Sequence, residues 1–190
     1  IATSSKIPKD AIDLDFTIEK NIKNLTEVTG KKTNEITACL LERPRHKRII
    51  EDLLKLNVKL KLLSDGDVSG ALMVTEEKYG VDIFLGIGGG PEGVLAASAL
   101  DSYNCNFQGR FIFQNEKDIF RARKMGIQDL NKKYNINEIV KGETIFCASG
   151  ITNGDLVNGV KRDNNRYLVE TLVTHKNNSI NIVKNEITTT

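Results

Sequence analysis

The sequence predicts an α/β protein in which a layered, mostly parallel sheet is flanked by helices. Short apolar, β-branched runs alternate with helix-period runs between Glu35 and Ser149, as they do in successive β-α-β units. Polar turns rich in glycine or proline follow several of the apolar runs, where a strand would hand over to a helix. At 190 residues the chain fits one domain with a sizeable core.

The first elements follow from periodicity and stop signals. Apolar residues of the segment 16–28 fall on one helical face, and Gly30 is suited to end that helix. An apolar run over residues 36–41 predicts a strand. Pro44 then interrupts the pattern, and residues 46–56 carry the apolar stripe of a surface helix.

A second strand and its helix come next. Lysine alternates with apolar residues over 58–63, which is typical of a strand at a sheet edge or with one solvated face. We expect a helix over residues 68–78 and an apolar strand over 81–85. A glycine-rich turn then leads into an alanine-rich helix over residues 94–102.

In the last third of the chain, strand-like and helix-like runs alternate less regularly. The pattern predicts strands over residues 109–113 and 144–149, the latter of the buried type, a basic helix over 118–125 and a loop over 131–137. Two β-like runs, residues 167–173 and 180–183, flank a turn-rich segment, Lys176-Asn177-Asn178-Ser179, and predict a hairpin. We expect one compact unit with this hairpin at its end.

Composition excludes several classes of protein. The 27 basic and 25 acidic residues nearly balance and do not cluster, so no nucleic-acid partner is expected. No apolar run approaches the ~18 residues of a membrane span. Cys39, Cys105 and Cys147 form no CxxC pair and predict reduced thiols in the cytoplasm. The chain begins at Ile1 rather than Met, and its first ten residues resemble no targeting signal, so it looks like part of a longer protein.

Three polar turns each follow the carboxyl end of a predicted strand: Arg43-Pro44-Arg45-His46, Asp65-Gly66-Asp67, and Gly88-Gly89-Gly90-Pro91-Glu92. Ligands of open α/β sheets bind outside the carboxyl ends of the strands. If the three strands are parallel, their turns converge at one edge. This convergence predicts a ligand site.

The first two turns each allow two interpretations. Arg43 and Arg45 could together grip a phosphate through their planar guanidinium groups, or they could belong to a solvated basic loop. The carboxylates of Asp65 and Asp67 suit sugar hydroxyls or a divalent cation. Alternatively, Asp67 caps the helix that follows it.

The glycine turn matches the dinucleotide fingerprint G-x-G-x-x-G over Gly88 to Gly93. However, the carboxylate of Glu92 would repel a pyrophosphate at this position. A divalent cation between Glu92 and a phosphate would remove the conflict, because Mg²⁺ binds through one or two carboxylates together with phosphate oxygens. Glu92 could also simply favour the helix dipole.

Other catalytic patterns are weak. His46 and His175 have no ligand spacing between them, and each is expected to be a surface or helix-start residue rather than a catalyst. Neither a GxSxG motif nor a P-loop lysine is present in the sequence.

From about Asp10 onward, the chain resembles the carboxyl-terminal part of class II fructose-1,6-bisphosphatases, including the branch that also uses sedoheptulose 1,7-bisphosphate. The resemblance rests on the three turns and on three further motifs in matching order: Gln108-Gly109-Arg110, Lys124-Met125-Gly126-Ile127 and Ala148 to Leu156. It implies the carboxyl-terminal domain of a two-domain sugar phosphatase of the inositol-monophosphatase-like superfamily. It also implies a homo-oligomer, either a dimer or a tetramer.

The resemblance implies removal of the 1-phosphate of fructose 1,6-bisphosphate with Mg²⁺ or Mn²⁺, in gluconeogenesis or the reductive pentose phosphate cycle. The turn Arg43-Pro44-Arg45 would hold the distal phosphate and Asp65-Gly66-Asp67 the sugar. Gly89 would contact substrate, and Glu92 would bind the metal. Arg43 departs from the family's usual lysine, and Gly90 from its usual alanine.

The family's preceding domain, with most metal carboxylates and the catalytic threonine, has no match in these residues. The resemblance therefore implies no catalytic residue in residues 1–190, which would form the substrate-binding domain and be inactive alone. Two other functions stay open: a nucleotide-dependent oxidoreductase that uses Gly88 to Gly93, and a non-catalytic sugar-phosphate-binding module.

Overall fold

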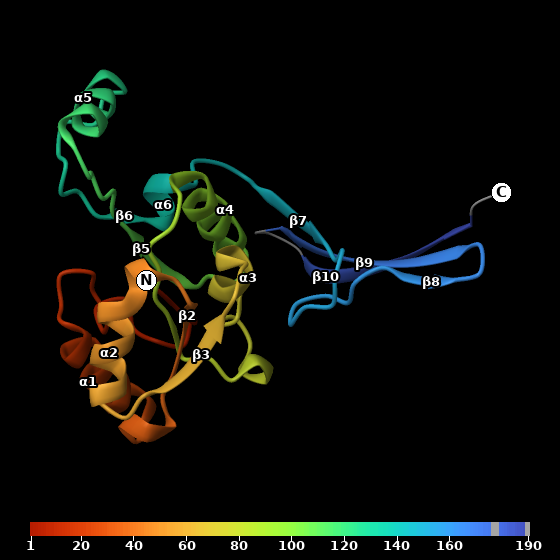
Figure 1. The fold of residues 1–190 in the computed structure, drawn as a ribbon, viewed down its shortest axis with the longest axis horizontal. Helices are drawn as coiled ribbons and strands as arrows, with labels where there is room; N and C mark the ends of the chain where they lie inside the picture. The colour runs from red at the N-terminus through yellow and green to blue at the C-terminus, as the bar shows by residue number, and fades with distance from the viewer. Residues whose placement is uncertain (176–178, 189–190) are drawn as a thin grey trace.

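The computed structural model describes residues 1–175 and 179–188. It shows an α/β body and a β arm that projects from it (Figure 1). The six strands of the body lie in the order β3-β2-β4-β1-β5-β6. Their bounds are β1 Ala2–Thr3, β2 Thr37–Leu41, β3 Lys59–Leu63, β4 Ile83–Phe84, β5 Asn106–Gly109 and β6 Tyr134–Asn135. The arm is the sheet of β7 Ile145–Ser149, β8 Lys161–Asp163, β9 Arg166–His175 and β10 Ser179–Thr188.

The body sheet is mixed, so the prediction of a mostly parallel sheet was wrong in part. Strands β3, β2 and β4 are parallel, with Leu40 of β2 opposite Leu62 of β3. The short strand β1 lies antiparallel between β4 and β5, and β6 is antiparallel to β5. Because β1 opposes both neighbours, β4 and β5 still point in the same direction. The carboxyl ends of β2, β3, β4 and β5 therefore share one edge.

Successive side chains of a strand point to opposite faces of the sheet, so they pack into two separate hydrophobic cores. Ala38 and Leu40 of β2 pack with α1 (Ile18–Thr29) and α2 (Lys47–Lys55) on one face. Cys39 of β2 packs on the other face with α3 (Asp67–Leu72) and α4 (Gly90–Asp101). Helices thus cover both faces, which confirms the layered α/β class.

The predicted helices are present with shifted ends. Thr17 caps α1 by accepting a hydrogen bond from the Lys20 N–H, and Gly30 ends it in the left-handed conformation. Helix α3 stops at Leu72 instead of residue 78, and a 3₁₀ turn over Glu77–Tyr79 follows. Helix α4 begins four residues earlier than expected, at Gly90, because proline is favoured in the first turn of a helix. Helix α5 spans Glu116–Lys124, close to its prediction.

Several predictions between residues 105 and 140 were wrong. The strand expected over 109–113 lies at Asn106–Gly109, because it pairs with β1, where Ala2 faces Phe107. The expected loop over 131–137 contains β6 and the start of helix α6 (Ile136–Ile139). Strand β1 was not predicted. Each of these elements depends on a partner about 25 to 105 residues away in the chain, which local patterns do not reveal.

The carboxyl-terminal hairpin is confirmed, but the chain is not one compact unit. Strands β9 and β10 pair along ten residues each and extend away from the body (Figure 1). Strand β7 belongs to this antiparallel arm and is half exposed rather than of the buried type, and β8 was not predicted. Of the turn predicted at residues 176–179, positions 176–178 lie outside the described residues.

The three cysteines are free thiols, as predicted; Cys39 and Cys105 are buried and Cys147 is exposed. Within the described ranges, none of the helices has the length and apolar character needed to cross a membrane.

Candidate functional site

The three predicted turns meet at the carboxyl edge of the parallel strands. Each of β2, β3 and β4 runs directly into one of them, and the strands lie side by side in the order β3-β2-β4. The edge is therefore built from three segments that are separated in sequence by about 20 residues each. Contacts between side chains of one turn and the backbone of another hold it together.

His46 links the first and third turns through both nitrogens of its ring. Its ring is fully buried, its Nδ1 lies 2.7 Å from the Leu41 carbonyl, and its Nε2 lies 2.8 Å from the Ile87 N–H. A carbonyl can only accept, so Nδ1 carries the proton and Nε2 accepts from Ile87. This tautomer satisfies both partners. His46 thus fixes the glycine turn against the end of β2.

The prediction that His46 is a surface or helix-start residue was half right. It does stand at the start of α2, but it has no exposed surface. The sequence signal available was its position between a buried strand and a helix, immediately after Arg45. That signal does not distinguish a solvated ring from one that joins two loops.

The two arginines of the first turn are held at different points. The Arg45 Nε donates to the Ile87 carbonyl, and the Arg45 side chain is exposed. Arg43 Nη2 lies 3.6 Å from Asp65 Oδ1, which joins the first turn to the second. Pro44 begins a 3₁₀ turn, Pro44–His46, that separates the two guanidinium groups. Arg45 keeps its four Nη–H donors for a ligand.

The second turn approaches the third through Asp67. Gly66 adopts the left-handed conformation with φ +87°, and Asp67 begins α3, with its Oδ1 accepting from the Val68 N–H at 3.0 Å. A Cβ added to Gly88 would lie 2.7 Å from Asp67 Oδ2. Gly88 is therefore needed for the carboxylate of Asp67 to reach this position. The interpretation of Asp67 as the cap of this helix was wrong, because Gly66 is the N-cap and Asp67 is the first helical residue, with its side chain against the glycine turn.

Gly89 and Glu92 form a compact unit at the start of α4. Gly89 precedes the helix in an extended conformation, and Glu92 lies in its first turn. The Glu92 carboxylate folds back over Gly89, so that a Cβ on Gly89 would collide with Oε2. Among the described residues, this carboxylate has neither a hydrogen bond nor an ion pair. An exposed carboxylate without a partner, beside bare backbone, can serve as a cation ligand.

The donor set is too small for a complete metal centre. Within the described part of the chain, no group of three or more His, Cys, Asp or Glu side chains is placed to hold a metal ion. Glu92 could supply one ligand to a divalent cation. Any further ligands would have to come from a substrate, from water or from another polypeptide segment.

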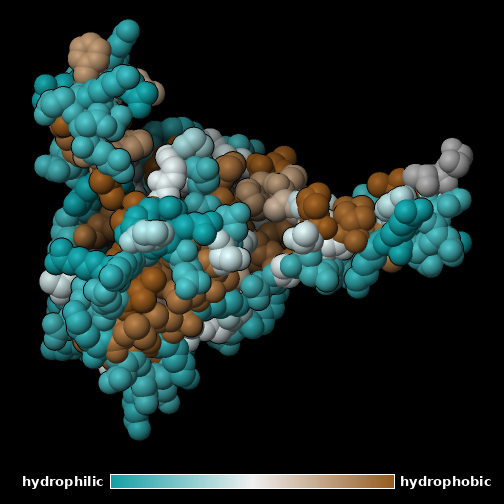
Figure 2. Space-filling view, viewed as in Figure 1, coloured by the Kyte–Doolittle hydropathy of each residue, from teal (hydrophilic) through white to brown (hydrophobic). Residues whose placement is uncertain are grey.

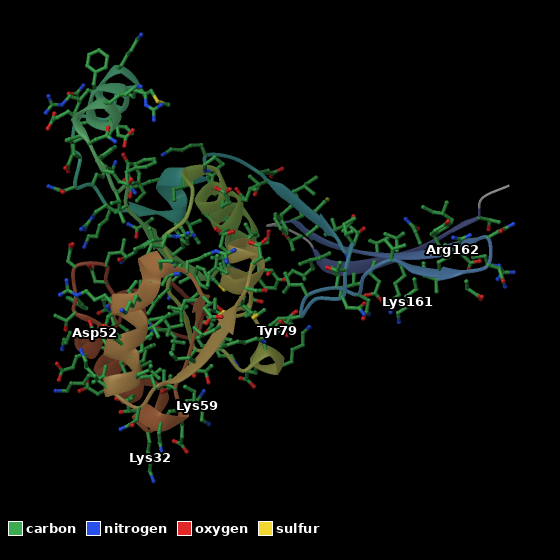
Figure 3. The ribbon with its side chains drawn as sticks, viewed as in Figure 1. Lys32, Asp52, Lys59, Tyr79, Lys161 and Arg162 are labelled. Atoms are coloured by element: carbon green, nitrogen blue, oxygen red, sulfur yellow. The ribbon has the colours of Figure 1, made fainter. Side chains whose placement is uncertain are left out.

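Two hollows of the described chain lie away from the three turns. They have volumes of about 380 and 500 Å³ and contain none of the predicted site residues. The smaller involves Tyr79, labelled in Figure 3, and the larger is mainly apolar, with Val68, Leu95 and Cys147 in its wall. The larger hollow has no charged residue in its wall, and the two charged residues of the smaller, Glu76 and Lys78, form an ion pair with each other at 2.8 Å. Neither hollow coincides with the polar edge formed by the three turns.

Comparison with known proteins gives a single consistent result. A family model described as bacterial fructose-1,6-bisphosphatase, glpX-encoded, matches residues 1–187.

Similar proteins also carry fructose-1,6-bisphosphatase in their names. A D-fructose 1,6-bisphosphatase class 2/sedoheptulose 1,7-bisphosphatase of Trichodesmium erythraeum is 32% identical over 88% of this chain and 52% of its own length. A fructose-1,6-bisphosphatase class 2 of Haemophilus influenzae is 32% identical over 87% of this chain and 54% of its own. A bifunctional enzyme of Synechococcus is 33% identical over 87% and 51%. The chain thus spans about half the length of these relatives.

Proposed function

Because the chain belongs to the family of glpX-encoded bacterial fructose-1,6-bisphosphatases, we propose that it forms the substrate-binding part of a divalent-metal-dependent sugar-bisphosphate phosphatase. The complete enzyme would remove the 1-phosphate of fructose 1,6-bisphosphate. The names of several relatives add sedoheptulose 1,7-bisphosphate as a second substrate. The observation that carries the proposal is the meeting of an arginine turn, an aspartate turn and a glycine turn with Glu92 at one sheet edge.

In this proposal Arg43 and Arg45 hold the distal phosphate. The Arg43–Asp65 pair is an exposed ion pair at 3.6 Å, and pairs of this kind contribute only about 0–1 kcal/mol. A phosphate can therefore replace Asp65 as the partner of Arg43 at little cost. Arg45 is already oriented by its contact with Ile87, so less conformational freedom is lost when its remaining donors bind.

In the same proposal the two aspartates bind the sugar, and the glycine turn binds the end of the substrate that reacts. The carboxylates of Asp65 and Asp67 accept hydrogen bonds from sugar hydroxyls, and Gly66 provides the left-handed turn that separates them. Gly89 exposes backbone to which substrate can come close. Glu92 provides one carboxylate ligand to Mg²⁺ or Mn²⁺, which when bound would neutralise charge that develops on the transferred phosphoryl group.

The remaining metal ligands and the catalytic threonine would come from polypeptide outside these 190 residues, since the described residues hold no metal cluster of their own. We further propose that the enzyme works as a homo-oligomer. The nucleotide-dependent oxidoreductase is the weaker alternative, because Gly90 to Gly93 lie inside α4 with the Glu92 carboxylate among them. The experiments below distinguish a non-catalytic sugar-phosphate-binding module from a phosphatase.

Calorimetry on the 190-residue chain tests the binding role. We expect fructose 1,6-bisphosphate to bind and NAD not to bind. Arg45→Ala should weaken sugar bisphosphate binding by about tenfold or more, because charge-assisted hydrogen bonds contribute about 1.5–3 kcal/mol. Lys47→Ala is the matched control, because Lys47 is a neighbouring cation that is 81% exposed. Tight NAD binding, or equal effects of the two substitutions, would contradict the proposal.

Phosphate release tests the catalytic role. We expect none from the 190-residue chain with either cation, whereas the complete enzyme should turn over. In the complete enzyme, Gly89→Ala should displace the Glu92 carboxylate and lower activity at limiting metal, as should Glu92→Gln. Gly93→Ala is the control, because an added Cβ there meets nothing within 4 Å. Unchanged activity of Glu92→Gln would remove Glu92 from the metal site, and a complete protein that binds but never hydrolyses would establish the binding module.

A further inference from the structure

The start of helix α4, which carries Gly89 and Glu92, is weakly stabilised by its own residues. Gly89 is the N-cap and has no side chain to accept hydrogen bonds from the free N–H groups of the first turn. Gly90 and Gly93 lie in this turn, and glycine loses more conformational freedom in a helix than any other residue. The first buried residue of α4 is Ala96. The first turn therefore needs support from another part of the fold.

The ring of Phe111 lies directly against this turn. A Cβ added to Gly90 would lie 3.5 Å from Phe111 Cε1, so the ring covers Gly90 at van der Waals distance. Phe111 comes two residues after β5, whose carboxyl end shares the sheet edge of the three turns. The segment after β5 therefore forms a fourth connection at this edge. It brings an apolar ring to a turn whose own side chains, those of Pro91 and Glu92, are exposed.

Phe111 is itself held by its neighbours. Its ring meets Tyr134 edge-on, with the centroids 5.8 Å apart and the planes at 79°, and its centroid lies 6.1 Å from that of Phe113. Aromatic rings attract each other in such arrangements. Tyr134 belongs to β6, which pairs with β5. Arg110, the residue before Phe111, forms an ion pair with Asp15. These contacts fix the position of the Phe111 ring relative to the sheet.

The glycine turn is consequently held at both of its ends. Before the turn, the Ile87 N–H donates to the ring of His46 at 2.8 Å. After it, Gly90 packs against Phe111. The two residues between these contacts, Gly88-Gly89, supply the backbone that the proposed function assigns to the substrate. A backbone segment fixed at both ends loses little conformational freedom when a ligand binds to it.

The position of Glu92 depends on the same turn. Its carboxylate folds back over Gly89, where an added Cβ would collide with it. The Gly93 N–H donates to the Gly89 carbonyl at 3.1 Å, so that the residues from Gly89 to Gly93 form one hydrogen-bonded turn. Gly90, which Phe111 covers, lies inside this turn. Opening of the turn would therefore displace the Glu92 carboxylate.

We propose that Phe111 is a positioning residue of the candidate site. By packing on Gly90 it keeps the first turn of α4 closed, and this turn places Gly89 and the Glu92 carboxylate. Phe111 acts through the turn and needs no contact with the substrate or the metal. Its role rests on the proposed function, which assigns Gly89 to the substrate and Glu92 to the metal. The packing itself depends neither on that function nor on what covers the outer face of the ring.

Amide hydrogen exchange of the 190-residue chain, followed by NMR, tests the packing. Phe111→Ala should speed exchange of the Gly93 N–H by about tenfold, because this hydrogen bond closes the turn that the ring covers. Exchange of the Ile87 N–H, which His46 holds, should stay unchanged, whereas a general loss of stability would speed both. Phe111→Leu keeps an apolar side chain at the contact and should restore most of the protection of Gly93.

Phe120→Ala is the matched control, because Phe120 is 68% exposed on α5. Figure 1 shows α5 standing away from the body, and Figure 2 shows mainly hydrophilic residues, coloured teal, over it. This variant should leave exchange at Gly93 unchanged. Unchanged exchange at Gly93 in Phe111→Ala, equal effects of the two substitutions, or an equal rise at Ile87 would each refute the packing role of Phe111.

Activity of the complete enzyme tests what the packing does. Phe111→Ala should raise the concentration of Mg²⁺ or Mn²⁺ that gives half-maximal activity by about threefold or more, and Phe120→Ala should not. In a Glu92→Gln background, Phe111→Ala should cause no further change in metal dependence, because it acts through Glu92. Additive effects would overturn the positioning role. If Glu92→Gln alone leaves activity unchanged at limiting metal, the metal role of Glu92 and its positioning by Phe111 both fail, while exchange at Gly93 still decides the packing.

Discussion

Replacing the buried His46 by alanine should destabilise the protein and loosen the candidate site together. The ring is fully buried and is the acceptor for the Ile87 N–H at 2.8 Å and the donor to the Leu41 carbonyl at 2.7 Å. The side chain of alanine can neither accept the first hydrogen bond nor donate the second. The turn after β2 then loses its side-chain link to the backbone N–H of the glycine turn after β4.

The magnitude follows from two losses. The two hydrogen bonds contribute about 1 kcal/mol each, and removal of a buried ring leaves a cavity that costs about 1–2 kcal/mol even after partial collapse. We therefore expect His46→Ala to lower the free energy of unfolding by about 3–4 kcal/mol. That is a large share of the about 5–15 kcal/mol available to a typical domain.

Urea denaturation of the 190-residue chain at pH 7 measures the effect, with Lys47→Ala as the neighbouring control. Lys47 is exposed and pairs only loosely with Glu51, at 3.9 Å, so its removal should change stability by less than about 0.5 kcal/mol. Calorimetry below the unfolding transition should also show weaker binding of fructose 1,6-bisphosphate to His46→Ala. A loss of stability no larger than that of Lys47→Ala would refute the role assigned to the ring.

Two further predictions concern protonation and thiol chemistry. A hydrogen bond from the backbone N–H of Asn158 lowers the pKa of Glu170 most, and the ion pair with Lys184 adds to this, so that the pKa is about 2 instead of the ordinary 4.5. The ionised carboxylate therefore stabilises the fold above pH 4.5, and this contribution is lost as the pH falls toward 2. In Glu170→Gln, the free energy of unfolding measured by denaturation should therefore fall less between pH 5 and pH 2 than it does in the unmodified protein. An equal fall in both proteins would count against this role of Glu170. Burial raises the pKa of the Cys39 and Cys105 thiols to about 11, so native protein at pH 8 should take up one equivalent of iodoacetamide, at Cys147. Mass spectrometry that locates early label on a buried cysteine would contradict it.

Local patterns were sufficient for much of the site. The turns around Arg43, Asp65 and Gly88 each follow a strand that its own residues predict, and the parallel pairing of β2, β3 and β4 brings them together as expected. The role of each residue in substrate or metal binding remains a prediction. The contact that holds the first and third turns together, between His46 and Ile87, could not be predicted from the sequence, because it joins atoms 41 residues apart.

The sequence by itself determined the α/β class, the helices with their stop signals, and the order of the three turns, because these depend on interactions within a few residues. The tertiary structure alone decided that β1 enters the sheet antiparallel, with Ala2 between Phe84 and Phe107. It also decided that His46 is buried and that the hairpin projects from the body. These features depend on which distant surfaces pack together, and burial and pairing over such distances leave no periodic signal in the chain.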